Sequence, residues 1–520
     1  MAFLATLTAP LAALAEGGHF AGLGAIAPEL TLVVFSMAGL VVDLVTRGRN
    51  SSLVGWVTMA GLAIAGLQLA STFGSPSQTV FGLVVVDNFA AFFKLFTVAA
   101  LMVVVYFVMT DRNERKHDIG EYYFLLISAG IGIFFMVGTN NLLLLMLGIE
   151  LLSLSSYSLA GFHKGEKRSA EAAMKYVVFG GLSAGIMVYG MSLLYGLTGT
   201  LDLTVMASAA GDGIPRSLAA AVESSPATVA IAVVLILAGF AYKVSVAPFH
   251  FWAPDVYEGA PTPVTTFLAV ASKAAGFGAL LRFLAVLFAG PGVQEAVAQY
   301  GTQVGMLMAV LAAITMSLGN LAAVRQESVK RMLAYSSVAH AGYALMGVVA
   351  MNAAGFEAAM YYLAAYYFMN LGAFGFLLYF QGVTGEETYE SLKGMGPKTP
   401  LISSAMVVFL ISLTGLPPTI GFVGKLELIK AALSSDKQLG WLVLCLVLNS
   451  VVSLYYYLRV IKEMYLSEPV ADAQSPKPQP AMATFLIAMA VLTVFFGLYF
   501  APLLDWAHSS MDLLATTTAG

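Results

Sequence analysis

The sequence predicts an all-α, polytopic membrane protein with about fourteen transmembrane helices, two inverted five-helix repeats and two discontinuous helices, the seventh and the twelfth. Three observations predict this fold class. First, 59% of the 520 residues are hydrophobic and 10% are charged, whereas a soluble domain carries about 25% charged residues. Second, short segments recur at a nearly constant separation. Third, prolines interrupt two apolar runs that also contain a lysine.

Apolar runs long enough to span a bilayer occur along the whole chain. A spanning helix needs roughly 20 mainly apolar residues, and fourteen segments meet this condition. We expect spans at residues 24–46, 52–73, 86–110, 120–138, 140–162, 168–198, 227–249, 263–288, 302–324, 331–351, 355–383, 399–432, 438–466 and 481–506. The first twenty residues lack the basic start of a signal peptide, so we expect a short terminal extension there.

Basic residues are concentrated in alternate loops. When each loop is numbered by the span before it, the odd loops hold sixteen of the 25 Lys and Arg residues. The even loops and both tails hold only Arg216 and Lys437. The positive-inside rule therefore predicts that the odd loops are cytoplasmic and that both termini are periplasmic. The seventh loop is an exception, because it contains Asp255 and Glu258 and no basic residue.

The remaining seven basic residues lie inside the predicted spans. A charge at the bilayer centre costs about 2.5–3.5 kcal/mol, so it usually faces the protein interior or water. Arg282 and Lys430 lie near span ends and Lys94 lies slightly deeper, so we expect these three side chains to snorkel to the interface. Four lysines lie too deep for that interpretation: Lys175, Lys243, Lys273 and Lys425.

The chain contains an internal duplication. EAAMKY at 171–176 recurs as EAAMYY at 357–362, and GFAYK at 239–243 recurs as GFVGK at 421–425, with offsets of 186 and 182 residues. Such self-similarity predicts two units, spans four to eight and nine to thirteen. Because each unit has an odd number of spans, the units are inverted, as in ion-coupled transporters. We therefore divide the chain into leading helices with the terminal extension, a first repeat, a second repeat, and a final helix with the tail: residues 1–115, 120–290, 300–467 and 478–520.

Prolines interrupt spans seven and twelve beside their lysines. Lys243 is followed by Pro248, and Lys425 is preceded by the segment GLPPTIG. Proline removes a backbone donor and clashes with the preceding turn, which predicts a discontinuous helix at both places. The freed backbone groups need partners from packed protein or water, so hydration is expected beside these lysines. The alternative is that the two lysines only bond to stray carbonyl groups.

Glu150 is the only carboxylate in the middle of a strongly apolar span. A buried ammonium favours a nearby anion, so we expect Glu150 to pair with Lys243 and to control whether the lysine is charged. A permanent structural ion pair is the alternative. Six buried groups then form a candidate proton relay: Glu150, Lys175, Lys243, Lys273, His340 and Lys425. His340 could instead be a helix-helix hydrogen bonder, and His250, beside the break in span seven, is either structural or the mouth of the path.

The segment KVSVAPFHFWAPDVYEGAPTPVT at 243–265, with GIELLSLSSYSLAGF and GLPPTIGFVGK at the expected distances, closely resembles the antiporter-like N subunits of respiratory complex I, the proton-pumping NADH:quinone oxidoreductase. The DVYEGAP continuation favours the N type over its sister subunits. The resemblance implies fourteen helices, a pair between Glu150 and Lys243 with Lys175 nearby, and Lys273 bridging toward Lys425.

We therefore expect a proton-translocating membrane subunit of a complex I-like oxidoreductase in a bacterial inner (plasma) membrane. The sequence has no nucleotide-binding loop and no spaced Cys/His set, so we expect no cofactor or metal in this chain. Flavin and iron-sulfur clusters are expected in partner subunits. Expected partners are the lipid bilayer, other antiporter-like subunits and small K-, J- and A-type subunits, and no nucleic acid. The alternatives are an Mrp-type cation/proton antiporter subunit and a non-transporting scaffold.

Overall fold

A computed structural model describes residues 22–110, 118–208, 217–288, 291–435, 437–469 and 479–517. Within these residues, 13 helices are long and apolar enough to cross a membrane. A further span is divided between two shorter helices, so the predicted all-α polytopic fold with about fourteen spans is confirmed. The terminal extension expected at residues 1–20 lies outside the described residues, and the division into repeats stays a prediction.

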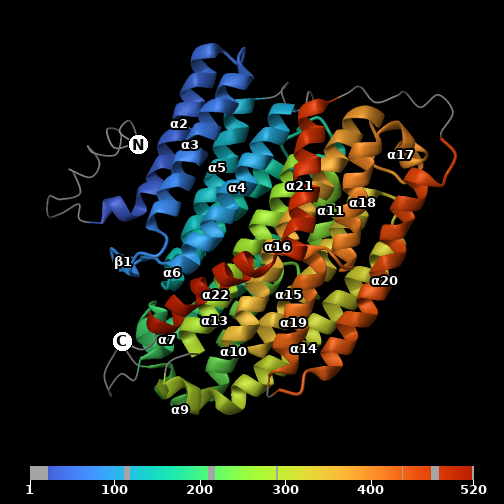
Figure 1. The fold of residues 1–520 in the computed structure, drawn as a ribbon. Coiled ribbons are helices and arrows are strands. Elements are labelled where there is room, and N and C mark those ends of the chain that lie inside the picture. Colours follow the sequence, from blue (N-terminus) through green and yellow to red (C-terminus); the bar gives the residue numbers. More distant parts are fainter. Residues whose placement is uncertain are drawn as a thin grey trace.

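The leading part of the chain forms three spans at one edge of the bundle (Figure 1). A short 3-10 turn, η2 (Leu23–Ile26), leads into α2 (Ala27–Thr46), and α3 (Ser51–Thr72) and α4 (Asn88–Thr110) follow. The side chain of Asn50 caps α3 by accepting a hydrogen bond from the backbone N–H of Leu53. Strands β1 (Gln78–Val80) and β2 (Val84–Val86) form an antiparallel hairpin between α3 and α4 that the hydropathy pattern did not predict.

The next part of the chain contains five spans. They are built from α5 (Ile119–Val137), α6 (Leu142–Ala160), α7 (Lys167–Thr198), α10 (Pro226–Lys243) and the run α12 (Thr262–Phe267), η4 (Leu268–Ser272) and α13 (Lys273–Phe288). Short helices α8 (Leu203–Ala207), α9 (Leu218–Ser224) and α11 (Trp252–Gly259) lie between them. The prediction that the seventh span is discontinuous is confirmed, because α10 ends at Lys243 and α11 begins only at Trp252.

Five further spans follow. They are α14 (Pro291–Val324), α15 (Val329–Ala350), α16 (Ala353–Thr384), the pair α18 (Pro400–Thr414) and α19 (Ile420–Leu433), and α20 (Gly440–Tyr465). The turns η5 (Glu390–Leu392) and α17 (Met395–Lys398) precede α18. The twelfth span breaks between Thr414 and Ile420, as the prolines predicted. Nearly every residue of α15 and α16 is buried, so these two helices form the centre of the second group.

The last span is shorter than predicted. Helix α21 (Pro480–Leu498) ends eight residues before the expected boundary, and a separate helix, α22 (Ala501–Thr517), follows. Figure 1 shows α22 running obliquely across the bundle. The indole of Trp506 on α22 packs on Phe92 and Phe96 of α4, with ring centroids 4.8 and 5.4 Å away. This contact joins the end of the chain to the leading helices.

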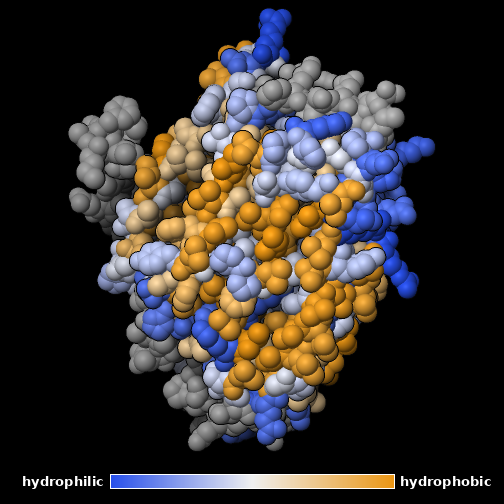
Figure 2. Space-filling view, turned by 45° about the vertical axis from the view of Figure 1, so that its right-hand side comes forward, coloured by the Kyte–Doolittle hydropathy of each residue, from blue (hydrophilic) through white to orange (hydrophobic). Residues whose placement is uncertain are grey.

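Even-numbered loops contact one another and odd-numbered loops contact one another, as expected when successive spans cross the membrane in opposite directions. Even loops meet through β-bridges between Val84 and Thr139 and between Asn141 and Asp202, and odd loops meet through a bridge between Ser328 and Thr388. Large apolar side chains remain exposed on the outer helices, and Figure 2 shows them over the middle of one face with hydrophilic residues toward its ends. An apolar belt between polar ends is the surface that a bilayer requires.

Candidate functional site

Lys243 occupies the end of a half-helix inside the bundle. It is the last residue of α10 and is 4% exposed. Its ammonium donates a hydrogen bond to the hydroxyl oxygen of Ser153 on α6, at 3.2 Å. The carbonyl groups at a helix C-terminus carry partial negative charge, which favours a cation there. The break in span seven therefore creates a polar position for Lys243 without a carboxylate contact.

Glu150 lies close to Lys243 but does not touch it. Both residues line one small cavity of about 10 Å³, together with Ser153, Tyr157 and Tyr242. The two side chains form no ion pair in the structure, although their charges attract across the cavity. A volume of about 10–15 Å³ is what one water molecule requires. The structure thus brings the predicted partners to a common cavity of single-water size, with Ser153 as the direct partner of Lys243.

Lys175 lies at the edge of this region and is not buried, so the prediction that it lies deep within its span is wrong. Its ammonium contacts Asp255 at 2.6 Å and Glu171 at 2.7 Å, and its side chain is 37% exposed. Asp255 also pairs with Arg331 at 2.9 Å, and Arg331 pairs with Glu258. Basic residues of α7 and α15 thus balance the two carboxylates of the seventh loop, which explains why that loop carries no basic residue itself. Lys175 has no hydrogen bond to Glu150 or Lys243 in the described residues.

Lys273 begins α13 directly after the π-helical turn η4. Such turns occur frequently at functional sites because they leave backbone groups without their usual partners. Lys273 is 3% exposed, and its ammonium donates to both the carbonyl and the hydroxyl of Ser337 on α15. Gly276, one turn along α13, accommodates the side chain of Lys243, because a Cβ built on Gly276 would lie 3.3 Å from Cγ of that lysine. The side chain of Lys243 therefore packs against α13 one turn after Lys273, which is the first residue of that helix.

Lys425 is held at the break between α18 and α19. Its ammonium donates to the last two carbonyls of α18, those of Leu413 at 3.3 Å and Thr414 at 2.7 Å, and to the hydroxyl of Ser450 at 2.9 Å. It also lies 4.6 Å from the ring centroid of Tyr343. Lys243 is the last residue of α10, before the break in its span, whereas Lys425 belongs to α19, after the break. Both ammonium groups nevertheless lie at the C-terminus of a half-helix, α10 for Lys243 and α18 for Lys425.

His340 is buried near the middle of α15. Its two ring nitrogens contact the hydroxyls of Tyr362 and Tyr457. His250 is also buried, in the break of span seven, and its Nδ1 atom has no hydrogen-bond partner in the described residues. Three contact residues of this region were not predicted from the sequence: Ser337, Tyr362 and Tyr457. The polar run SSVAH before and at His340 could have indicated the serine, but tyrosines within apolar helices carry no distinguishing sequence signal.

Two buried cations were predicted wrongly. Lys94 does not snorkel, because it is 3% exposed and forms an ion pair with Glu29 at 2.6 Å. Arg282 is 1% exposed and binds both carboxylate oxygens of Asp87, at 2.7 and 2.9 Å. Burial raises the pKa of Asp87, but the charge and hydrogen bonds of Arg282 outweigh burial and hold that pKa below its ordinary value. Lys430, whose side chain is 58% exposed, is the one member of the three that extends to the surface.

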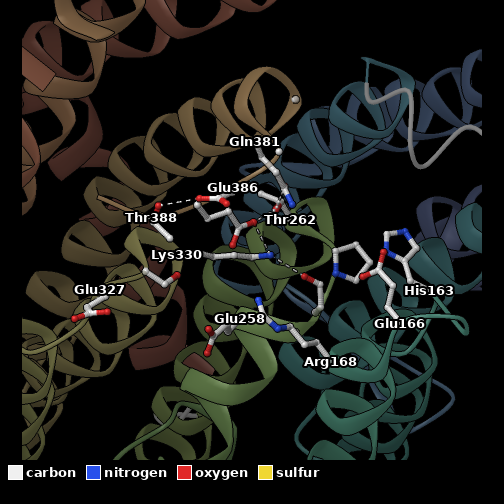
Figure 3. Close-up of a pocket in the computed structure, with 17 residues that line it drawn as sticks. His163, Glu166, Arg168, Glu258, Thr262, Glu327, Lys330, Gln381, Glu386 and Thr388 are labelled. Carbon is white, nitrogen blue, oxygen red and sulfur yellow. Dashed lines mark hydrogen bonds and ion pairs between the residues drawn. The ribbon is translucent and has the colours of Figure 1, made fainter. Parts of the chain in front are cut away.

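A polar pocket of about 720 Å³ lies where the odd loops meet (Figure 3). Lys330 is buried at its base, where it donates to the carbonyl of Ala260 at 2.9 Å and pairs with Glu387 at 3.2 Å. Thr262, at the start of the span that leads to Lys273, also lines the pocket. The pocket therefore opens at the N-terminal end of the span that carries Lys273.

Comparisons with known proteins agree with the predicted family and fold. The family described as NADH:quinone oxidoreductase/Mrp antiporter, TM, matches residues 139–453. NADH-quinone oxidoreductase subunit N of Chlorobium chlorochromatii is 42% identical over 499 residues, covering 95% of each chain. Subunit N 2 of Sorangium cellulosum is 40% identical over 509 residues, covering 95% of this chain and 98% of the relative.

Solved structures extend the agreement. A chain of respiratory complex I from Thermus thermophilus, determined with bound aureothin, is 32% identical with a TM-score of 0.75, covering 92% of this chain and 98% of that one. A chain of the Mrp complex from Dietzia sp. shares the fold at 22% identity, with a TM-score of 0.81 over 96% of this chain and 100% of that one. The predicted resemblance is confirmed: the chain belongs to the NADH:quinone oxidoreductase/Mrp antiporter family of transmembrane proteins, among the N subunits of NADH-quinone oxidoreductase.

Proposed function

We propose that this chain translocates protons through Glu150, Lys243, Lys273, His340 and Lys425, with Lys175 in a supporting role, as a membrane subunit of a complex I-like NADH:quinone oxidoreductase. One contrast supports the proposal above all others. Two buried cations, Lys94 on α4 and Arg282 on α13, are each neutralised by a carboxylate. Among the described residues, the ammonium groups of Lys243, Lys273 and Lys425 hydrogen-bond only to neutral hydroxyl and carbonyl oxygens.

This contrast has a direct physical meaning. A buried cation held by a carboxylate keeps its proton, because losing it would leave an uncompensated buried anion. A lysine held only by neutral oxygens leaves no such anion when it deprotonates, so both of its protonation states are accessible. Maintaining a charge in that setting is nonetheless costly, and proteins retain such groups mainly where ions or protons move. Lys243, Lys273 and Lys425 meet this description.

The geometry suggests a role for each group. Glu150 modulates the charge of Lys243 across the cavity of single-water size. Lys175 supports that site indirectly, because through Asp255 it anchors α11, the second half of the broken span. Lys273 receives the proton next, His340 carries it onward, and Lys425 exchanges it with the far side of the membrane. The polar pocket beside Thr262 is the proposed uptake side, because it lies among the loops that the positive-inside rule assigns to the cytoplasm.

The energy for transport must come from the partner subunits. We propose that flavin and iron-sulfur clusters in those subunits drive the relay, that neighbouring antiporter-like and small K-, J- and A-type subunits contact this chain, and that the complex lies in a bacterial inner membrane with both termini periplasmic. The similar offsets of the recurring segments, 186 and 182 residues, support the proposal that spans four to eight and nine to thirteen are inverted repeats.

The test uses the complete complex, reconstituted in vesicles, and measures NADH-driven proton uptake per assembled complex. Lys243→Ala should abolish most uptake while leaving assembly largely intact, and Lys243→Arg should not restore it because arginine stays protonated. Lys430→Ala is the matched control, since that lysine is exposed and paired with Glu427. Normal uptake by an assembled Lys243→Ala complex would remove this residue from the mechanism.

A further inference from the structure

The environment of His340 is unusual because hydroxyl groups occupy both ring nitrogens. Nδ1 lies 2.6 Å from the hydroxyl of Tyr362 on α16, and Nε2 lies 3.3 Å from the hydroxyl of Tyr457 on α20. All three side chains are at most 3% exposed. Three helices thus contribute one hydroxyl-imidazole-hydroxyl chain at the centre of the bundle.

The chemistry of these partners permits two arrangements of the same hydrogen bonds. A neutral imidazole donates from one nitrogen and accepts at the other, and a hydroxyl can do either. A carbonyl or carboxylate partner would fix the tautomer, because it only accepts. With Tyr362 and Tyr457 as partners, His340 can exchange one tautomer for the other without any side chain losing its hydrogen bond.

The two ends of this chain point toward different lysines. The hydroxyl of Tyr457 also bonds to Ser336, and the next residue, Ser337, binds the ammonium of Lys273. At the other end, the ring of Tyr362 packs on the residue before Lys425, because a Cβ built on Gly424 would lie 3.0 Å from Cδ2 of that tyrosine. Tyr457 is thus on the Lys273 side of His340, and Tyr362 is on the Lys425 side.

His340 also lies between two cations. Tyr366 connects it to one of them, since the Tyr366 ring centroid is 5.8 Å from the ammonium of Lys273 and 5.1 Å from the imidazole centroid. Tyr343 connects it to the other, at 4.6 Å from the ammonium of Lys425 and 5.4 Å from the imidazole centroid. An additional positive charge on the imidazole would be repelled from both sides, so a step that keeps the ring neutral is favoured.

We infer that Tyr457, His340 and Tyr362 carry the proton from the Lys273 side to the Lys425 side by a tautomer switch, an inference that rests on the proposed function and adds the two tyrosines to it. The Tyr457 hydroxyl gives its proton to Nε2 and receives another from the Lys273 side through the hydroxyl of Ser336. Nδ1 gives its proton to the Tyr362 oxygen, and Tyr362 releases its original proton toward Lys425. Each of these atoms gains one proton and loses one, and the ring ends as the other neutral tautomer. Restoring the starting tautomer requires the imidazole to turn away from the two hydroxyls, because reversal of the transfers through them would carry the proton back.

The experiment replaces each hydroxyl in the complete reconstituted complex. Tyr457→Phe and Tyr362→Phe remove one oxygen and keep the ring, and each should lower proton uptake per assembled complex by about a hundredfold or more, the range that a positioned acid-base group contributes. Tyr361→Phe is the matched control. Tyr361 precedes Tyr362 and is equally buried, but its hydroxyl donates to the carbonyl of Phe496 and not to His340. Uptake by either test variant equal to that of Tyr361→Phe would overturn the inference.

A second substitution separates proton transfer from packing. 3-Fluorotyrosine at position 457 keeps the ring and the hydroxyl but makes the phenol more acidic, so the pH profile of uptake should shift, whereas a purely structural tyrosine would leave it unchanged. If Tyr457→Phe does not assemble, the pH profile of the fluorotyrosine variant tests the inference by itself. Lys273→Met in the same assay distinguishes the two levels of the proposal. If Lys273→Met abolishes uptake and the tyrosine variants do not lower it, the tautomer switch fails and the proposed function stands.

Discussion

Gly415 lies at the point where the backbone of span twelve and the side chain of Lys425 meet. Its φ of +87° is in the left-handed region, and a Cβ built there would lie 2.7 Å from Cδ and 3.3 Å from Nζ of Lys425. Gly415→Ala therefore combines backbone strain with displacement of the lysine. Gly74→Ala is the matched control, because Gly74 has a φ of +82° and a Cβ there would meet nothing within 4 Å.

The structure gives separate magnitudes for these two effects. The left-handed conformation costs a residue with a Cβ about 1–2 kcal/mol, and both variants incur that cost. Only Gly415→Ala also moves Lys425 away from the carbonyl of Thr414, now 2.7 Å from its ammonium. A hydrogen bond to a charged group contributes about 1.5–3 kcal/mol. If that loss enters the barrier to proton transfer, uptake falls by roughly tenfold to a hundredfold.

The assay measures two quantities for both variants: the amount of assembled complex on native gels and the initial rate of NADH-driven proton uptake per assembled complex. Both variants should assemble at similar, slightly reduced levels. Gly415→Ala alone should lose uptake by about tenfold or more. Equal uptake by the two variants would refute the reasoning, because it would mean that the position of the Lys425 ammonium does not limit transport.

Four further predictions concern charged groups. Glu150→Gln should lower proton uptake per complex at several pH values, because the neutral amine of Lys243 is favoured without the countercharge. Glu150→Asp keeps the charge and should retain more uptake. Unchanged uptake by Glu150→Gln would refute a role for this carboxylate. Arg282→Met should lower the assembled level by destabilising the fold by about 3–5 kcal/mol, and Asp87→Leu added to it should restore part of that loss, as measured by thermal denaturation of the complex. Because Arg282 holds the pKa of Asp87 below its ordinary value, stability from this pair should be present above about pH 4 and be lost as pH falls through the lowered pKa. Lys175→Met should reduce uptake far less than Lys243→Ala, because Arg331 still holds Asp255, and an equally severe loss would place Lys175 directly in the relay.

The helices and their breaks could be predicted because each depends on local sequence. Hydropathy identifies a span without reference to any other segment, and the prolines near Lys243 and Lys425 interrupt hydrogen bonds within their own helices. The last boundary was misplaced at residue 506, since α22 is apolar enough to continue the hydropathy signal of α21 although the backbone changes direction after Leu498.

The partners of the buried charges could not be predicted in the same way. Arg282 and Asp87 are 195 residues apart and Lys94 and Glu29 are 65 apart, so only tertiary packing brings them together. Position within a span suggested snorkelling for Lys94 and Arg282, but both helices lie inside the bundle, where a long side chain has no route to water. The same limit applies to His340, whose tyrosine partners come from two other helices.

Proton uptake compared between two classes of buried lysine tests the central claim most directly. Lys273→Met and Lys94→Met remove equally buried cations, one bound to neutral oxygens and one paired with Glu29. Lys273→Met should assemble and lose most NADH-driven uptake per complex. Lys94→Met should reduce the amount of complex, while each assembled complex still transports protons normally. Normal uptake per complex by Lys273→Met, or loss of uptake per complex by a fully assembled Lys94→Met, would contradict the claim.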